Sequence, residues 1–504
     1  MFPRLLLNNL SRNKPFCLFG ARGVGKTTLI GEFAGKFSNF IHLDLETEAD
    51  RAIFNFDVSA DETLRAISFL KGTEIRGSGT LIVLDEIGRC AGALRWVREQ
   101  VGGWTGGQVG GRTGGQVDGW TGGQVDGWTG GQVDRRTGGE AEGRGPMIVA
   151  VSSVMTKELA GLTDPVDGYL QACFLFPFSF EEFLIAIVDE PALEAFREVP
   201  VPFYAYEKLL NHFHLYSLIG GMPEITAEYA SSRHLAGLKQ VYRKIENRFI
   251  ECLPDFTPGA KSRDLTAEVL QNTYPFAATR ISFNRFGNLD KGSREISQAF
   301  KALESIFFLQ MIYPGTSAVL PVSPDQSRFP RLQLADTGLV NFFSGIQKPL
   351  FQSHDMNAIF EGQIARQVVG QEILAAGNTH ELDKPVNGQF SAQPAQSVHN
   401  GMAGLNFWTR DKIQSTAEVD FVLPYNDLLI PVVVRSGEPG RLRSLHQFID
   451  AAPHAYAIRL YAGKLTVLQT QTLHGKKFFL LNLPYFLAGK IREYLNGFIR
   501  LANG

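Results

Sequence analysis

The stretch Gly20-Ala21-Arg22-Gly23-Val24-Gly25-Lys26-Thr27-Thr28 decides the fold of the N-terminal part of the chain. It matches the pattern GxxxxGK[ST], with a short apolar run at 16–19 before it and the helix-forming sequence LIGEFAGKF after it. This order predicts a strand, a glycine-rich loop and a helix, whose backbone N–H groups bind phosphate. The residues expected to contact a nucleotide are Gly20, Arg22, Gly23, Val24, Gly25, Lys26, Thr27 and Thr28.

An acidic pair follows a second apolar run. Leu-Ile-Val-Leu at 81–84 precedes Asp85 and Glu86, and an unbroken apolar run of this kind is typical of a strand covered on both faces. Asp85 and Thr27 are expected to hold Mg²⁺, and Lys26 to reach the β and γ phosphates. Glu86 is expected to polarise the attacking water.

Further apolar runs complete a predicted α/β domain with a parallel sheet of five strands. They lie at 41–45, 147–153 and 174–176. The run at 147–153 ends in hydroxyl groups, and Ser152 is expected to sense the γ-phosphate or to orient water.

A repeat with a period of eight residues interrupts this domain at 101–146, with units such as WTGGQVDG. Two or three glycines per unit make ordering costly, and one large apolar residue per unit offers little burial in return. The segment is therefore expected to be a disordered surface loop; an aromatic binding array is the alternative. Calcium binding is not expected, because a calcium-binding β-roll needs a period of nine.

The composition is that of an ordinary globular protein. The 504 residues include 49 Lys and Arg and 51 Asp and Glu, with 44% hydrophobic and 20% charged residues. These values exclude a histone-like basic protein and an acidic disordered chain. The chain contains no apolar run of the length of a membrane span and no signal peptide, so a cytoplasmic protein without a membrane partner is expected. The four cysteines form no CxxC motif, which predicts neither a zinc site nor disulfides.

Several motifs together resemble the prokaryotic AAA-superfamily ATPases, most closely the archaeal-ATPase-like members of the STAND class that carry a C-terminal domain of unknown function. The motifs are FGARGVGKTTL, LIVLDEI, FPFSFEEFL at 176–184, GGMPE at 220–224, ADTGLVN at 335–341, EVDFVL at 418–423 and IPVVVRSG at 430–437.

The resemblance implies a helical lid that begins at the GGMPE turn. It places Gly220, Gly221 and Pro223 near the adenine of ATP, although the turn alone indicates only a loop. The preference for adenine also rests on the resemblance. Members of the family usually have an arginine where this chain has Tyr169, after Gly168, so slow hydrolysis is expected.

The middle of the chain resembles the winged-helix-type segment of the family. Apolar residues from Ser293 onward have helical spacing, and 309–322 is predicted to form a strand and a turn. DNA contact through this helix is one interpretation, and an ordinary amphipathic core helix is the other.

The final third resembles a restriction-endonuclease-like core with a degenerate site. Glu361 on a helix and Asp420 at a strand end match two metal-binding positions, and Glu418 is expected on the same strand face as Asp420. Val433 and Arg435 stand where the family's acidic-x-Lys pair would be. Valine has no oxygen for a metal and a guanidinium does not act as a base near neutral pH, so no nuclease chemistry is expected. Arg435, Arg441 and Arg443 could still contact phosphates, or simply be solvated.

The predicted domains are an ATPase domain at 1–230, a helical lid with a winged-helix-like segment at 231–350, and a nuclease-like domain at 351–504. The expected function is that of an ATP-binding, slowly hydrolysing switch that requires Mg²⁺ and signals to an unidentified protein or nucleic acid. The alternatives are a DNA-binding regulator or toxin-system component that uses ATP structurally, and an ATP-dependent nuclease. Arg89 and Arg95 are candidates, by position only, for an arginine supplied in trans.

Overall fold

The computed structural model describes residues 2–56, 58–104, 145–164, 168–253, 259–348, 362–380, 398–399, 402–411, 417–435 and 442–503. Most of the octapeptide repeat, Glu361 and Arg441 lie outside these residues, so the predictions made for them stay predictions.

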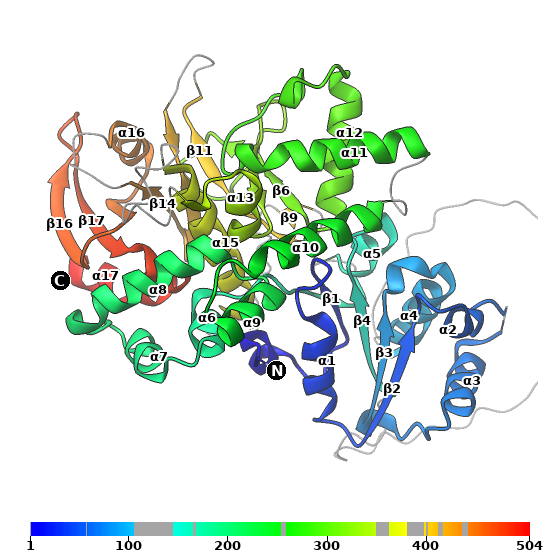
Figure 1. The fold of residues 1–504 in the computed structure, drawn as a ribbon. Helices are drawn as coiled ribbons and strands as arrows, with labels where there is room; N and C mark the ends of the chain where they lie inside the picture. Colours follow the sequence, from blue (N-terminus) through cyan, green and yellow to red (C-terminus); the bar gives the residue numbers. More distant parts are fainter. Residues whose placement is uncertain are drawn as a thin grey trace, which may run out of the picture.

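The N-terminal part is built on a five-stranded parallel sheet in the order β2-β3-β4-β1-β5 (Figure 1). Its strands are β1 (Phe16–Phe19), β2 (Asn39–Asp44), β3 (Thr80–Asp85), β4 (Met147–Ser152) and β5 (Gln171–Phe174). The helices between them are α1 (Lys26–Ala34), α2 (Glu48–Ala52), α3 (Ala60–Lys71), α4 (Ala91–Trp104) and α5 (Lys157–Leu162). The predicted α/β class and parallel sheet are confirmed. The fifth strand begins and ends earlier than the predicted 174–176.

Both faces of this sheet are covered, as the unbroken apolar runs predict. Side chains alternate along a strand, so Phe16 and Leu18 of β1 pack on one face with α1, while Cys17 and Phe19 join a separate core on the other. Ile67 of α3 belongs to that second core, as do apolar residues of α4 and α5. The carboxyl ends of the strands are therefore held rigidly at one edge, where a ligand site of such a sheet lies.

A helical segment and a two-stranded sheet follow. The helices are α6 (Phe180–Ala186), α7 (Glu190–Arg197), α8 (Tyr206–Ile219), α9 (Pro223–Ser232), α10 (Leu238–Cys252), α11 (Ala260–Thr273), α12 (Ser293–Ser305) and α13 (Thr337–Phe343). Strand β6 (Leu309–Ile312) pairs antiparallel with β8 (Arg331–Leu334). The predicted helix from Ser293 is confirmed, and the strand expected from residue 309 is short.

The C-terminal part contains the long helix α15 (Gln363–His380) and a mixed five-stranded sheet in the order β13-β14-β15-β17-β16. These strands are β13 (Phe421–Tyr425), β14 (Leu428–Val434), β15 (Tyr456–Tyr461), β16 (Thr466–Gln471) and β17 (Lys477–Pro484). The helices α16 (Arg443–Ala451) and α17 (Ile491–Asn503), the 3-10 helix η11 (Tyr485–Lys490) and a small sheet of β7 (Pro314–Gly315), β11 (Phe407–Thr409) and β12 (Glu418–Val419) complete this part. None of the described helices is long and apolar enough to cross a membrane.

Candidate functional site

The glycine-rich loop lies between the end of β1 and the start of α1. Helix α1 begins at Lys26 directly after Gly25, whose φ of 98° is in the left-handed region. No side chain caps this helix end, so the N–H groups of its first turn point into the loop without a side-chain acceptor. The loop thus fits a phosphate group, which those N–H groups and the positive end of the helix would bind.

Lys26 is buried, and its ammonium folds back over the loop. Its Nζ donates to the carbonyl oxygens of Gly20 at 2.8 Å and Ala21 at 3.2 Å. Burial lowers the pKa of Lys26, while the nearby carboxylates of Glu86 and Asp85 act in the opposite direction. The structure therefore brings together three of the predicted site residues. The two carbonyl oxygens offer the Lys26 ammonium only partial negative charge, whereas a bound phosphate would offer it a full negative charge.

Asp85 ends β3 and has a partner that the sequence did not reveal. Its Oδ2 lies 3.2 Å from Nε2 of His42 on the neighbouring strand β2. This hydrogen bond, together with the charge of Asp85, raises the pKa of His42. His42 thereby holds one oxygen of Asp85, the predicted metal-side carboxylate.

Glu86 and the hydroxyls at the end of β4 form a second contact across neighbouring strands. Both Glu86 oxygens accept from Ser153, Oε1 from the hydroxyl at 2.6 Å and Oε2 from the backbone N–H at 3.1 Å. Ser152 is fully buried, and its hydroxyl donates to the carbonyl of Val154 at 2.8 Å. Ser153, for which the sequence predicts no role, is therefore the hydroxyl that contacts Glu86, and the sensor role of Ser152 stays a prediction.

The predicted lid turn lies over the glycine-rich loop. A Cβ on Gly25 would lie 3.9 Å from Cγ of Pro223, and one on Gly23 would lie 3.9 Å from Cε of Met222. Arg248 of α10 approaches from the same side, since its Nη1 would lie 3.0 Å from a Gly23 Cβ. No local sequence pattern predicts a role for Arg248.

Arg248 is oriented by an acidic residue of the lid. Its Nη2 lies 2.6 Å from Oε2 of Glu224, whose other oxygen lies 2.6 Å from Nζ of Lys244. These two cations lower the pKa of Glu224 despite its partial burial. A guanidinium thus stands next to the loop that is expected to hold the nucleotide phosphates.

The GGMPE turn is fixed by a buried aspartate from the ADTGLVN motif. Oδ2 of Asp336 accepts from the N–H of Gly221 at 2.6 Å, and Oδ1 accepts from the N–H of Leu339 at 3.1 Å. A Cβ on Gly220 would lie 2.2 Å from Oδ1 of Asp336, so this contact requires glycine. Burial raises the pKa of Asp336 to about 6. Two motifs more than a hundred residues apart in the sequence therefore form one contact.

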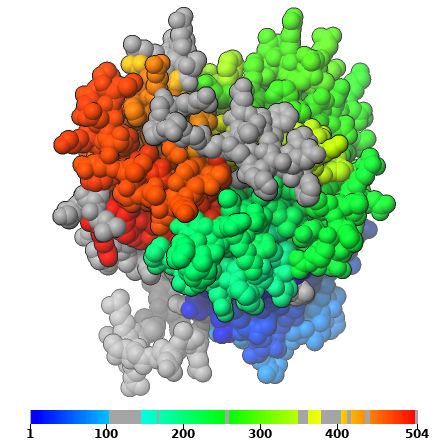
Figure 2. Space-filling model, turned by 60° about the vertical axis from the view of Figure 1, so that its left-hand side comes forward, coloured from blue at the N-terminus to red at the C-terminus, as the bar shows by residue number. Residues whose placement is uncertain are grey.

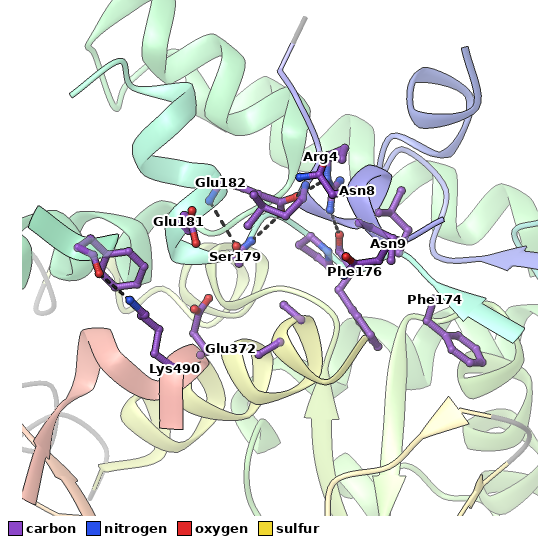
Figure 3. A pocket seen from close by; sticks show the side chains of 18 of the residues that line it. Arg4, Asn8, Asn9, Phe174, Phe176, Ser179, Glu181, Glu182, Glu372 and Lys490 are labelled. Atoms are coloured by element: carbon purple, nitrogen blue, oxygen red, sulfur yellow. Dashed lines mark hydrogen bonds and ion pairs between the residues drawn. The ribbon is translucent and has the colours of Figure 1, made fainter. Parts of the chain in front are cut away.

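Arg4 supports the loop from behind. Its Nη1 donates to the carbonyl of Val24 at 2.6 Å, its Nη2 to that of Phe176 at 2.6 Å, and its Nε to Glu182 at 2.9 Å. Arg4, Phe176 and Glu182 border a cavity of about 310 Å³ (Figure 3), which Glu372 of α15 and Lys490 of η11 also line. The FPFSFEEFL motif thus connects the glycine-rich loop with the C-terminal part of the chain.

The remaining predicted residues differ in their exposure and in their partners. Thr27 is exposed and Thr28 half-buried at the start of α1, and Val24 is buried beneath the loop. Arg22 forms an ion pair with Glu46, which also lies 3.5 Å from Arg89. Arg89 therefore has an acidic partner within its own chain, whereas Arg95 is exposed on α4.

The predicted degenerate site in the C-terminal part contains arginines next to its carboxylates. The expected continuous strand is interrupted at Asp420, since β12 ends at Val419 and β13 begins at Phe421. Asp420 is 1% exposed; its Oδ2 accepts from the N–H of Val434, and its Oδ1 lies 3.9 Å from Arg366 and 3.8 Å from Arg435.

Glu418 is engaged elsewhere, at 3.3 Å from Nη1 of the fully buried Arg331. Because of the interruption, the argument that Glu418 and Asp420 share one strand face does not hold here. Guanidinium groups thus lie where a metal ion would have to approach. Arg443 begins α16.

Two families of known proteins match parts of the chain. A family described as an AAA domain matches residues 12–106, which contain the glycine-rich loop, His42, Asp85 and Glu86. The N-terminal part is thus similar to AAA domains, and its parallel sheet with the glycine-rich loop after β1 is P-loop-like. A domain of unknown function, DUF8612, matches residues 210–350, which contain the GGMPE and ADTGLVN motifs. No curated protein matches the chain.

Proposed function

We propose that the chain is an ATP-dependent molecular switch that binds Mg²⁺ with the nucleotide, hydrolyses it slowly and passes its nucleotide state to a partner. The observation that supports this most is the position of the lid turn. The side chains of Met222 and Pro223 lie beside the glycine-rich loop on one side, and on the other Gly221 donates to Asp336, against which Gly220 packs closely. Any movement of the loop on nucleotide binding would therefore act on the segment that follows.

In this proposal each site residue has a distinct task. Lys26 leaves the Gly20 and Ala21 carbonyls and binds the β and γ phosphates, while the N–H groups at the start of α1 bind phosphate oxygens. Thr27 and Asp85 hold the metal, which neutralises phosphate charge when bound.

Glu86 orients a water molecule, and in the described state Ser153 engages both its oxygens. These two hydrogen bonds hold the Glu86 carboxylate in place, and each of its oxygens keeps a second lone pair that can accept from the water molecule.

Calorimetric titration of the full chain with non-hydrolysable ATP and GTP analogues, with and without Mg²⁺, tests the proposal. We expect Mg²⁺-dependent binding with a preference for the ATP analogue, and loss of both binding and turnover in Lys26→Ala. Lys14→Ala, which changes an exposed lysine outside the loop, serves as the matched control. No heat with any nucleotide from folded protein would refute the proposal.

The two alternative functions predict other results. DNA binding that weakens with salt and that Glu86→Gln leaves unchanged would favour a regulator in which ATP has a structural role. Plasmid cleavage with Mg²⁺ that Asp420→Ala abolishes would establish a nuclease. The arginines around Asp420 support the proposal that no such cleavage occurs.

A further inference from the structure

Strand β16 (Thr466–Gln471) lies at one edge of the C-terminal sheet, and all six of its residues are exposed. It is the outermost strand of that part of the molecule in Figure 1, and Figure 2 shows the orange and red surface to which it belongs. Among the residues that the structure describes, it pairs only with β17. Its other edge therefore presents backbone groups to solvent.

The hydrogen bonds of β17 identify those backbone groups. The N–H of Phe479 donates to the carbonyl of Ala455, in the direction of β15. Gln469 is opposite Phe479 in the antiparallel ladder, so this pair exchanges no hydrogen bonds within it. By the alternation of the ladder, Val467, Gln469 and Gln471 direct their N–H and C=O groups away from β17.

The other edge strands of the two five-stranded sheets have features that discourage pairing, and β16 has none. Strand β2 contains His42 and ends in Asp44, β5 is only four residues long, and β13 contains Pro424. Charged side chains, short length and proline each discourage pairing with another chain. The sequence TVLQTQ of β16 has no charge, no proline and no glycine.

We propose that β16 pairs with β16 of a second copy of this chain, antiparallel and about a two-fold axis at Gln469. In this register Gln469 is opposite Gln469 of the second copy, and Val467 is opposite the second copy's Gln471. Each of these pairs exchanges both backbone hydrogen bonds, which satisfies all the outward groups of the strand. The two C-terminal sheets become one continuous sheet across the dimer.

A second copy fits this edge better than an unrelated strand, because the edge complements itself. The outward groups occur at positions symmetric about Gln469, and the absence of charge means that identical strands meet without repulsion. Leu468, which is 44% exposed, lies diagonally across the axis from Leu468 of the second copy. A contact limited to one strand is small, so the dimer is expected to be concentration-dependent.

Sedimentation equilibrium of the full chain over a range of concentrations tests this pairing. Gln469→Pro removes one outward N–H while leaving the ladder to β17 without a lost hydrogen bond, and Gln469→Ala keeps that N–H. We expect the wild type and Gln469→Ala to dimerise with the same dissociation constant. Gln469→Pro should raise the dissociation constant at least tenfold, because it removes two symmetric hydrogen bonds from each dimer. Unchanged circular dichroism would show that the variant folds.

A crosslink locates the axis. The four native cysteines are all buried, so a short bis-maleimide is expected to join two copies of Gln469→Cys and not two copies of Lys464→Cys. A wild-type chain that stays monomeric throughout, or a dimer that Gln469→Pro does not weaken, would overturn the proposal. These results do not depend on nucleotide, so they are independent of the proposed function.

Discussion

Glu86 accepts two hydrogen bonds from Ser153, and the proposed hydrolysis is expected to depend on this contact. Ser153→Ala removes the hydroxyl donor and leaves only the backbone N–H to position the carboxylate. A hydrogen bond to a charged group contributes about 1.5–3 kcal/mol, so we expect kcat for ATP hydrolysis to fall roughly tenfold or more, with little change in KM. Steady-state ATPase kinetics measure this. Ser153→Thr keeps the hydroxyl and should retain most of the activity; full activity in Ser153→Ala would contradict the assignment.

Glu372 is fully buried beside Tyr216 and the N–H of Phe180, and burial raises its pKa to about 8. The folded chain therefore keeps a proton that the unfolded chain releases near pH 4.5, and stability falls as pH rises from there to about 8. Between pH 6 and pH 9 we expect the ionisation of Glu372 to lower the free energy of unfolding by roughly 3 kcal/mol.

Glu372→Gln tests this, because the amide oxygen still accepts from Tyr216 and Phe180 and does not ionise. Urea unfolding at pH 6 and pH 9 should show a smaller loss of the free energy of unfolding in the variant than in the wild type. Asp336, whose pKa is raised to about 6, is half ionised at pH 6 and is present in both proteins, so its contribution cancels in the comparison. Equal losses in both proteins would show that Glu372 is already ionised at pH 6.

The residues of the site that sequence could identify are those whose role follows from neighbours in the chain. Lys26 and Asp85 stand in patterns that specify both a local structure and a chemistry. His42 and Arg248 act through space, since His42 reaches Asp85 from the next strand and Arg248 reaches the loop from α10. No local pattern encodes such partners; only the fold brings them together.

The GGMPE turn and α13 approach each other closely at two glycines. Gly220 packs against Asp336, and Gly338 of α13 packs against the backbone of Ile219. Gly220→Ala would place a Cβ 2.2 Å from Oδ1 of Asp336 at a φ of 85°, where an L side chain is strained. We expect a loss of about 2–4 kcal/mol in the free energy of unfolding, measured by urea or thermal denaturation. Gly161→Ala in α5 has no atom within 4 Å of the new Cβ and should be neutral or slightly stabilising. Equal stability of both variants would mean that the turn moves easily away from Asp336.

Strands were predictable where an apolar run is buried on both faces, as in β3 and β4, because burial alone selects such residues. Strand β5 was misplaced because only its last two residues are buried, so its start has no apolar signal. The interruption at Asp420 was not predictable either. It arises where β12 and β13 pair with different neighbours, β11 and β14, and pairing is a property of the whole sheet.

One apolar core joins the P-loop sheet to the C-terminal sheet, since Phe19, Leu339 and Leu483 belong to the same buried cluster. Two buried tryptophans report on the two parts of the chain. Trp96 belongs to this core and donates to Ala60 in the N-terminal part, whereas Trp408 belongs to a separate apolar cluster of the C-terminal part and donates to Thr316. Because this core contains residues of both parts, we expect the two parts to unfold together. A nucleotide bound to the N-terminal part then stabilises both parts against unfolding.

We therefore expect a saturating Mg²⁺–ATP analogue to raise the unfolding midpoint seen by either tryptophan equally. At a ligand concentration of a hundred times Kd the gain is about 2.7 kcal/mol. The measurement is fluorescence-detected unfolding of two variants that retain only Trp96 or only Trp408, with Lys26→Ala in each as the control without bound nucleotide. If the midpoint moves for Trp96 alone, the contact through Asp336 does not couple the two parts, and the C-terminal part unfolds independently of the nucleotide site.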